Sequence, residues 1–129
     1  MTRGLDLDQV PVELRAAVVA TLAAVGLDDG HISLSLVSPE RIAELNQVHR
    51  GKPQPTDVLS FPIDGIGPVN GPRELGDIVI CPEQSADLIE AAVHGTLHLC
   101  GYDHETDRGE MLALQDEIIG ALELAGSSR

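Results

Sequence analysis

Three of the five histidines in this chain lie within eleven residues, at positions 94, 98 and 104. On a helix, His94 and His98 are four residues apart, so both imidazoles face the same side and can reach one metal ion. Gly101 lets the chain turn sharply after the helix, since glycine adopts positive φ without a steric penalty. His104 can then return to the same point. The pattern predicts a helix that ends near residue 100 and a metal site at its end.

Three neutral imidazoles form a ligand set that favours Zn²⁺, although nickel, cobalt and copper also accept it. Three protein ligands leave a fourth coordination position open, which is typical of catalytic zinc sites. A histidine pair four residues apart is weak evidence by itself, because such pairs also arise on ordinary helices. The third histidine after a glycine favours the metal interpretation. We interpret the other two histidines, His31 and His49, as ordinary side chains without a functional role.

The spacing H-x3-H-x2-G-x2-H is also that of the zinc motif of metzincin peptidases, with one difference. Those enzymes place their general base, a glutamate, after the first histidine, and this chain has Gly95 there. The pattern therefore predicts a metal site without the peptidase base, whose activated water could cleave a phosphodiester. Asp103 is a base, a partner that orients a ligand, or a solvated acid. Met111 is expected in the core.

Hydrophobic periodicity and turn residues predict four helices and three strands. The expected helices cover residues 11–25, 39–49, 82–100 and 107–124, and the expected strands cover residues 31–37, 57–61 and 75–81, with a loop over 63–72. The residues expected to face inward are Leu14, Val18, Leu22, Val25, Ile32, Leu34, Leu36, Ile42, Leu45, Ile89, Val93, Leu97, Cys100, Met111, Gln115, Ile118 and Leu122. This irregular alternation predicts an α+β fold: a small mixed β-sheet covered by helices, zincin-like, with the three-histidine site at the end of a helix.

The length of 129 residues agrees with a single domain over residues 1–129. Apolar residues make up 43% of the chain but aromatic residues only 2%, so Leu, Val, Ile and Ala must form the core. No apolar run approaches the roughly 20 residues of a membrane span, and the N-terminus lacks the apolar stretch of a secretory signal. We therefore expect a cytoplasmic protein that does not bind membranes, with Cys81 and Cys100 as reduced thiols.

The net charge of −13 argues against nucleic-acid binding, because contact with phosphates requires Lys and Arg. The charge is uneven, however. Residues 83–123 carry ten acids and one base, whereas residues 41–73 carry four bases and three acids. This balance motivates the hypothesis of a local positive cleft on an acidic body. Its members would be the metal ion, Arg41, Arg50, Lys52 and Arg73.

Three stretches of this sequence together resemble a known family. They are "LNQVHRGKPQPTDVLSFP" at 45–62, "LGDIVIC" at 75–81 and "HGTLHLCGYDHE" at 94–105. In this order they resemble the YbeY endoribonuclease family of bacterial ribosomal RNA maturation factors. The resemblance extends from about residue 31 to residue 122, and the segment between Asp77 and His94 is shorter than in the family.

The resemblance implies a zinc-dependent, single-strand-specific endoribonuclease that acts in 16S rRNA maturation, ribosome quality control and ribosome assembly. Its partners would be ribosomal RNA and the small ribosomal subunit. One Zn²⁺ would be held by His94, His98 and His104. The family's functional arginine matches Arg50, which is expected to bind substrate and to act in catalysis, because a guanidinium can clamp a phosphate. Lys52 is expected to add a substrate contact.

Two other functions stay open. The chain could be a non-catalytic ribosome-assembly factor with a structural zinc, because the sequence offers few bases for RNA. It could also be a metallohydrolase of a peptide or small substrate, which the spacing of the histidines favours and Gly95 opposes. Thr56, Asp57 and Ser60 are expected to shape the groove without a chemical role.

Overall fold

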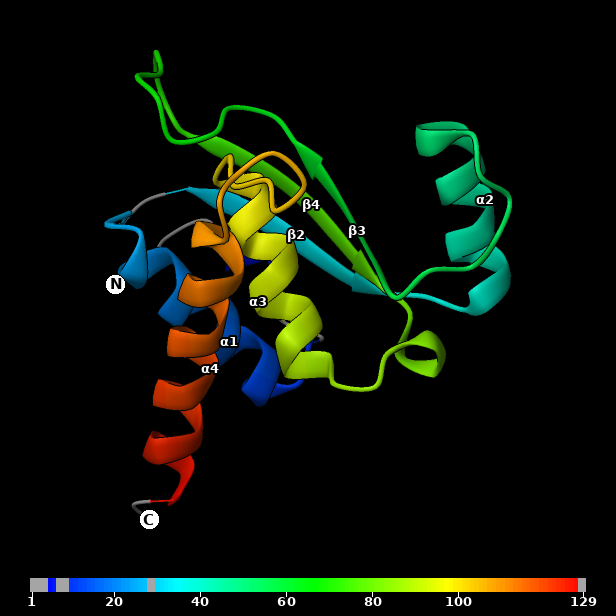
Figure 1. Ribbon diagram of the computed structural model, residues 1–129. Coiled ribbons are helices and arrows are strands. Elements are labelled where there is room, and N and C mark those ends of the chain that lie inside the picture. Colours follow the sequence, from blue (N-terminus) through cyan, green and yellow to red (C-terminus); the bar gives the residue numbers. More distant parts are fainter. Residues whose placement is uncertain (1–4, 7–9, 28–29, 128–129) are drawn as a thin grey trace.

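The computed structural model describes residues 5–6, 10–27 and 30–127, and Figure 1 shows its helices gathered around one small sheet. The elements in chain order are β1 (Leu5–Asp6), α1 (Val12–Ala24), β2 (His31–Leu36), α2 (Pro39–Arg50), β3 (Val58–Pro62), β4 (Glu74–Ile80), a 3-10 turn (Pro82–Gln84), α3 (Leu88–Leu99) and α4 (Glu110–Ser127).

The four strands form one mixed sheet in the order β1-β2-β4-β3. β1, β2 and β4 run parallel, and β3 runs antiparallel to β4 with Ser60 opposite Ile78. The predicted α+β fold with a small mixed sheet covered by helices is confirmed. β1 was not predicted, because a strand of two residues is too short to show a periodic pattern.

Hydrophobic clusters lie on both faces of the sheet. Ile78 and Ile80 of β4 belong to the larger cluster, which α1, α3 and α4 cover. Val79 and Cys81 alternate with them and belong to a smaller cluster with Ile42 of α2, since successive side chains of a strand point to opposite faces. Figure 1 shows α2 set apart from the other three helices. The sheet thus has α1, α3 and α4 on one face and α2 on the other.

The predicted helices over 11–25, 39–49 and 107–124 are confirmed within a few residues at each end. The hydroxyl of Ser38 caps α2 by accepting a hydrogen bond from the backbone N–H of Arg41 at 3.2 Å. The inward position predicted for Leu36 is wrong, because this side chain is 38% exposed. Leu36 ends β2 and lies outside the cluster that contains Ile32 and Leu34.

The predicted start of the third helix at Pro82 is also wrong. Pro82–Gln84 forms a separate 3-10 turn, and α3 begins at Leu88. The carboxylate of Asp87 caps α3 by accepting hydrogen bonds from the N–H groups of Ile89 at 3.0 Å and Glu90 at 3.2 Å. A capped start satisfies backbone donors that have no partner within the helix. Asp87 therefore determines where the histidine-bearing helix begins.

Both cysteines are free and buried, which agrees with the expectation of reduced thiols. Burial raises the pKa of the Cys100 thiol to about 11, so this group is protonated at neutral pH. Among the described residues, no helix is both long enough and apolar enough to cross a membrane.

We expect Asp87→Ala to lower the free energy of unfolding by about 1 kcal/mol, because two N–H groups of α3 lose their acceptor. Asp87→Asn keeps a capping oxygen and should lower the free energy of unfolding by only about a few tenths of a kcal/mol. Urea denaturation of both variants measures the difference. Equal losses in the two variants would contradict the capping role.

Candidate metal centre

The last two turns of α3 carry His94 and His98 on the face next to its buried stripe. Val93 and Leu97 are fully buried in the larger core cluster, and this fixes the rotation of the helix. His94 and His98 are consequently half-buried at the edge of the core, with their ring centroids 4.7 Å apart. The i, i+4 spacing gives the juxtaposition that the sequence predicts.

Both imidazoles have their Nδ1 atoms engaged. His94 Nδ1 lies 2.8 Å from Gln115 Oε1, and His98 Nδ1 lies 2.9 Å from the carbonyl oxygen of Tyr102. Each partner oxygen can only accept, so each Nδ1 donates a proton, and in a neutral ring Nε2 then carries a bare lone pair. These two contacts fix the tautomers of both histidines.

The two Nε2 atoms face each other at 3.1 Å. With both Nδ1 atoms protonated, two neutral rings have no hydrogen to share between these nitrogens, so their lone pairs repel unless a cation lies beside them. Two nitrogens bound to one tetrahedral zinc ion at about 2.0–2.1 Å lie about 3.3 Å apart. The spacing of the Nε2 atoms therefore fits a shared metal ion.

His104 returns to this point from the loop after α3. Its ring centroid lies 5.1 Å from that of His94 and 5.5 Å from that of His98. Gly101, with a φ of 96°, makes the turn out of the helix that the sequence predicts. The ligand atoms of the three histidines lie within 4.8 Å of one another, so this group could hold one metal ion.

The loop that carries His104 is held by its own backbone and by Asp103. The Asp103 carboxylate accepts a hydrogen bond from the N–H of Glu105 at 3.0 Å, and its carbonyl oxygen accepts from the N–H groups of Thr106 and Asp107. Asp103 is exposed. The structure adds a fourth role to the three considered for Asp103, which is to order the turn around His104.

Gly95 explains why no glutamate follows the first histidine. A Cβ at this position would lie 2.9 Å from Ile78 Cγ2 and 3.2 Å from Ser60 Oγ. Ser60 Oγ also donates a hydrogen bond to the carbonyl oxygen of Gly95 at 3.0 Å. This position of α3 therefore faces the sheet at close contact, and it cannot place a side chain beside the histidines.

A cavity of about 480 Å³ opens beside the three histidines. Its other walls come from the end of α2, from β3 with the residues that precede it, and from the loop after α3. Thr56, Asp57 and Ser60 line it, as the expectation of a groove requires. His49, interpreted from the sequence as an ordinary side chain, also lines it. The packing of α2 against β3, where His49 contacts Phe61, brings this residue to the cavity.

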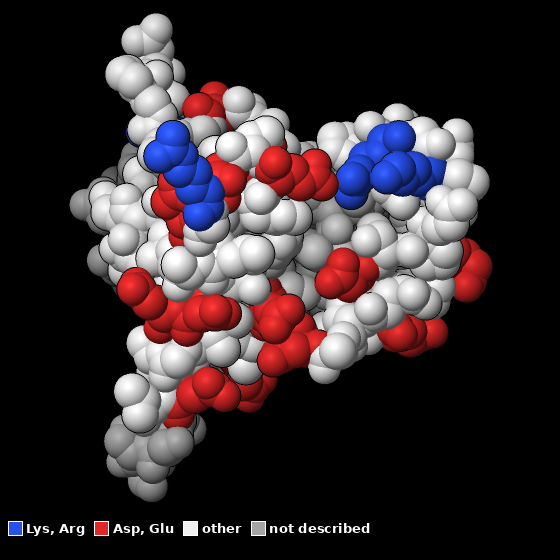
Figure 2. All heavy atoms as spheres, viewed as in Figure 1, with Lys and Arg blue, Asp and Glu red and all other residues white. Residues whose placement is uncertain are grey.

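The charge of the cavity differs from the expected positive cleft. Arg50 is the one Lys or Arg side chain among its lining residues in the described part of the chain, and three acids line it as well. These acids are Asp57, Asp103 and Glu105. Figure 2 shows acidic side chains spread over this face and basic ones in two places, one of them over α2.

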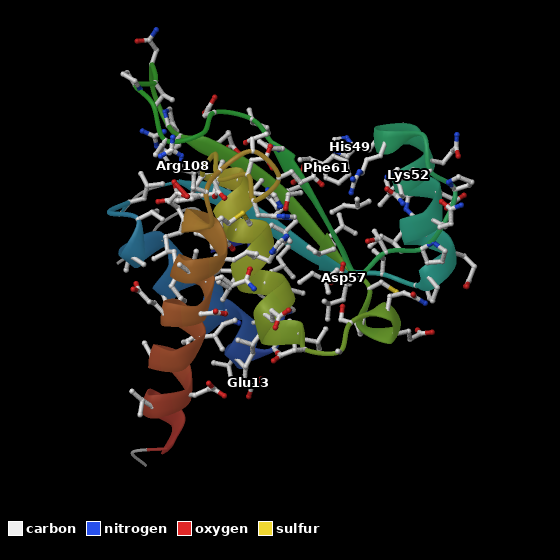
Figure 3. The ribbon with its side chains drawn as sticks, in the orientation of Figure 1. Glu13, His49, Lys52, Asp57, Phe61 and Arg108 are labelled. Carbon is white, nitrogen blue, oxygen red and sulfur yellow. The ribbon has the colours of Figure 1, made fainter. Side chains whose placement is uncertain are left out.

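The remaining expected cations lie elsewhere. Arg41 forms an ion pair with Glu44 at 3.5 Å, and Arg73 donates a hydrogen bond to the carbonyl oxygen of Gly65 in the loop between β3 and β4. The expectation that Arg41 and Arg73 share the cleft is therefore wrong. Lys52 follows the end of α2 and does not line the cavity, and Figure 3 shows it on the side of α2.

Gln115 is the second side chain whose role the sequence did not reveal. It was expected only as part of the inner face of α4, and it is 7% exposed there. A buried amide among apolar neighbours requires a partner, which in this structure is the imidazole of His94. The signal in the sequence was the polar residue within the stripe of Met111, Gln115, Ile118 and Leu122.

Residues 5–123 match the profile of the family described as Endoribonuclease YbeY. The chain belongs to the endoribonuclease YbeY family. The resemblance that its three sequence motifs indicated is thereby confirmed. The family is named for an endoribonuclease, an enzyme that hydrolyses phosphodiester bonds within RNA, and not for a peptidase. The three-histidine group is consistent with metal binding in such an enzyme.

Curated relatives of this chain carry the same description. The Endoribonuclease YbeY of Persephonella marina is 41% identical over 120 residues, covering 81% of this chain and 78% of that protein. The Endoribonuclease YbeY of Acinetobacter baylyi is 38% identical, covering 92% of this chain and 87% of that protein. The solution structure of TM1509 from Thermotoga maritima matches with a TM-score of 0.59 and 30% identity, over 99% of this chain and 93% of that one.

The alignment with the Acinetobacter baylyi relative spans 138 positions, more than the 129 residues of this chain. That relative therefore has residues without a counterpart here. This agrees with a shortened chain, and the location of the missing residues between Asp77 and His94 stays a prediction. In this structure that interval contains the end of β4, the 3-10 turn and the start of α3.

We expect Gly95→Ala to lower the free energy of unfolding by about 1–3 kcal/mol, because the added methyl group would be too close to Ile78 and Ser60. Gly120→Ala on α4 is the matched control, since a Cβ there meets nothing within 4 Å. The control should be neutral or stabilising by up to about 1 kcal/mol. Urea denaturation of both variants tests this contrast, and equal effects would refute the close contact between α3 and the sheet.

We expect Gln115→Ala to weaken metal binding by about 10- to 100-fold, because His94 loses the oxygen that fixes its tautomer. Gln47→Ala on the exposed side of α2 is the control and should leave the affinity unchanged. Competition with a chromophoric chelator measures both. Unchanged affinity in Gln115→Ala would show that the contact does not orient the ligand.

The protonation of His98 gives a prediction for the metal-free protein. Burial, followed by the nearby His94, lowers the pKa of His98. An unfolded chain therefore takes up this proton more readily, and stability is lost as the pH falls below about 6.5, the unperturbed value. Urea denaturation between about pH 7.5 and 5.5 should show a steeper loss for the wild type than for His98→Gln. Parallel pH profiles would contradict the lowered pKa.

Proposed function

We propose that this protein is a zinc-dependent endoribonuclease that cleaves single-stranded RNA, with ribosomal RNA as its substrate. The observation that carries the proposal is the pair of facing Nε2 atoms, 3.1 Å apart, in the same cavity as Arg50. Membership of the endoribonuclease YbeY family supports RNA as the substrate. Three imidazole nitrogens with room for a fourth ligand favour zinc over Mg²⁺ or Ca²⁺, which prefer oxygen.

The proposed metal ligands are His94, His98 and His104. A bound zinc ion would supply Lewis acidity and would lower the pKa of a coordinated water. The other tasks fall to the chain itself. Gln115 and the carbonyl group of Tyr102 hold the Nδ1 protons, so that Nε2 of His94 and His98 points into the cavity. This preorganisation reduces the cost of assembling the ligands.

Arg50 is the proposed catalytic and substrate-binding residue. It lies at the C-terminal end of α2 and lines the cavity with the histidines. Its guanidinium can bind two phosphate oxygens at once and stabilise the negative charge that grows on them during attack. Lys52, outside the cavity, would contact the RNA backbone next to the scissile phosphate as a point charge.

The acids that line the cavity would make substrate binding depend on a bound metal ion. Asp57, Asp103 and Glu105 outnumber Arg50, and an RNA phosphate would meet net negative charge. A divalent ion offsets two of these charges. We therefore propose that RNA binds to the metal-loaded protein and only weakly to the metal-free one.

The proposed cellular role rests on membership of the family. We propose that residues 1–129 act as one domain in the cytoplasm, on the small ribosomal subunit, in 16S rRNA maturation, ribosome quality control and ribosome assembly. The match of residues 5–123 to the family supports this role. The two alternatives, an assembly factor with a structural zinc and a hydrolase of peptides or small substrates, are outcomes of the test below.

We expect zinc-reconstituted protein to cleave single-stranded ribosomal RNA, and metal-free protein and His98→Ala to be inactive. Arg50→Ala should lower kcat by about 100- to 1,000-fold, because one donor to the developing charge is lost. Arg41→Ala, in which the lost arginine is exposed and paired with Glu44, is the matched control and should keep full activity. Product analysis on denaturing gels measures all four proteins.

Each alternative has its own result in this experiment. Tight zinc binding with no cleavage, together with lower stability of His98→Ala, would replace the nuclease proposal with the assembly factor. Zinc-dependent hydrolysis of a peptide library without RNA cleavage would favour the metallohydrolase. RNA cleavage that needs neither zinc nor Arg50 would indicate a contaminating ribonuclease and would refute the proposal.

A further inference from the structure

The few aromatic rings of this chain gather at the metal cavity. The sequence contains one Phe, one Tyr and no Trp. Tyr102 lines the cavity, and Phe61 contacts His49, which lines it as well. The buried members of the two hydrophobic clusters are not aromatic, and Tyr102 and Phe61 pack against these clusters from partly buried positions.

His49 rests on Phe61 at the edge of the cavity. The ring centroids lie 4.4 Å apart at an interplanar angle of 53°, and Figure 3 shows the two residues side by side between α2 and β3. Phe61 is half-buried and packs against the smaller cluster, whereas His49 is exposed. The imidazole is therefore supported by a ring that the core holds, and it keeps exposed surface beside Arg50.

Tyr102 lies in the loop after α3 and lines the same cavity as His49. Its backbone carbonyl fixes His98, and its half-buried ring packs against the larger cluster. In the described part of the chain, its hydroxyl group has no hydrogen-bond partner. The ring is thus held in place at the cavity while its polar end is available to a ligand.

We propose that His49, supported by Phe61, and Tyr102 form a base-binding subsite that stacks on unpaired nucleobases beside the phosphate bound by Arg50. This inference rests on the proposed RNA substrate. Base–aromatic stacking accepts any base, and it requires a base whose face is not already covered by neighbours in a duplex. The subsite gives a physical reason for a preference for single strands.

The charge of the cavity strengthens this assignment. Even with a divalent ion bound, the three acids and one arginine on its walls would leave no net positive charge, so phosphate contacts contribute little attraction. Stacking does not depend on net charge and is less sensitive to salt than phosphate contact. The rings therefore supply affinity that the acidic surface of this protein, with a net charge of −13, cannot supply.

The test measures binding separately from cleavage. Zinc-loaded protein is titrated into a fluorescent 2′-O-methyl oligoribonucleotide of about ten nucleotides, and its anisotropy is recorded after a gel has shown that the strand stays intact. We expect His49→Ala and Tyr102→Ala each to weaken binding by about five- to a hundredfold. His49→Phe and Tyr102→Phe, which keep a ring, should bind within about threefold of the wild type.

Two further probes separate stacking from charge and from folding. A strand of the same length with abasic sugars throughout should bind the wild type and His49→Ala equally, because it has no base to stack. Thermal unfolding establishes that each variant is folded. Equal losses in the Ala and Phe variants, or equal losses with the abasic strand, would overturn the stacking role.

The two proposals fail in different ways. Wild-type protein that cleaves single-stranded RNA, with ring variants that bind as well as the wild type, would overturn the base-binding subsite alone. Wild-type protein that neither binds nor cleaves RNA with zinc present would overturn the proposed function, and the subsite with it.

Discussion

The close contact of α3 with β3 and β4 at Gly95 is the constraint on which the site depends. No Cβ fits there, because Ile78 and Ser60 are too close, and Ser60 adds a hydrogen bond to the helix backbone at the same position. This contact and the burial of Val93 and Leu97 together set the rotation of α3 about its axis. His94 and His98 then flank the sheet-facing position and point to the cavity. A side chain at residue 95 would separate helix from sheet and would move both histidines.

The electrostatics of the site follow from two hydrogen bonds that α3 donates to other parts of the chain. Gln115 of α4 and the Tyr102 carbonyl of the next loop accept them from Nδ1 of His94 and His98, so the Nε2 lone pairs converge. In the absence of a cation this arrangement is unfavourable, because the two acceptors face each other and burial opposes protonation of His98. A divalent ion resolves both the lone-pair repulsion and the acidity of the cavity. Metal binding and substrate binding are therefore coupled through charge in the proposed function.

Much of the fold could be predicted from the sequence, because it rests on local patterns. The 3.6-residue period of α1, α2 and α4 and the alternation in β2 and β4 are properties of neighbouring residues, and each produced an element near its predicted place. The errors have a common origin. Leu36 continues the alternation of β2 but is exposed at its end. Pro82 opens only a short 3-10 turn, and α3 begins after Asp87, whose carboxylate accepts hydrogen bonds from the first N–H groups of that helix.

The sequence by itself determined the spacing of the three histidines, since helix geometry places residues 94 and 98 together and Gly101 permits the turn before His104. It also determined the family, through motifs that lie close to the site in the chain. Only the tertiary structure decided what surrounds the histidines. Gln115, His49 and Arg50 come from other helices, and their distances to the site depend on how α2 and α4 pack against the sheet and α3. Arg73, equally basic, was placed away from the cavity by that same packing, because no periodicity within a segment specifies which distant segment it meets.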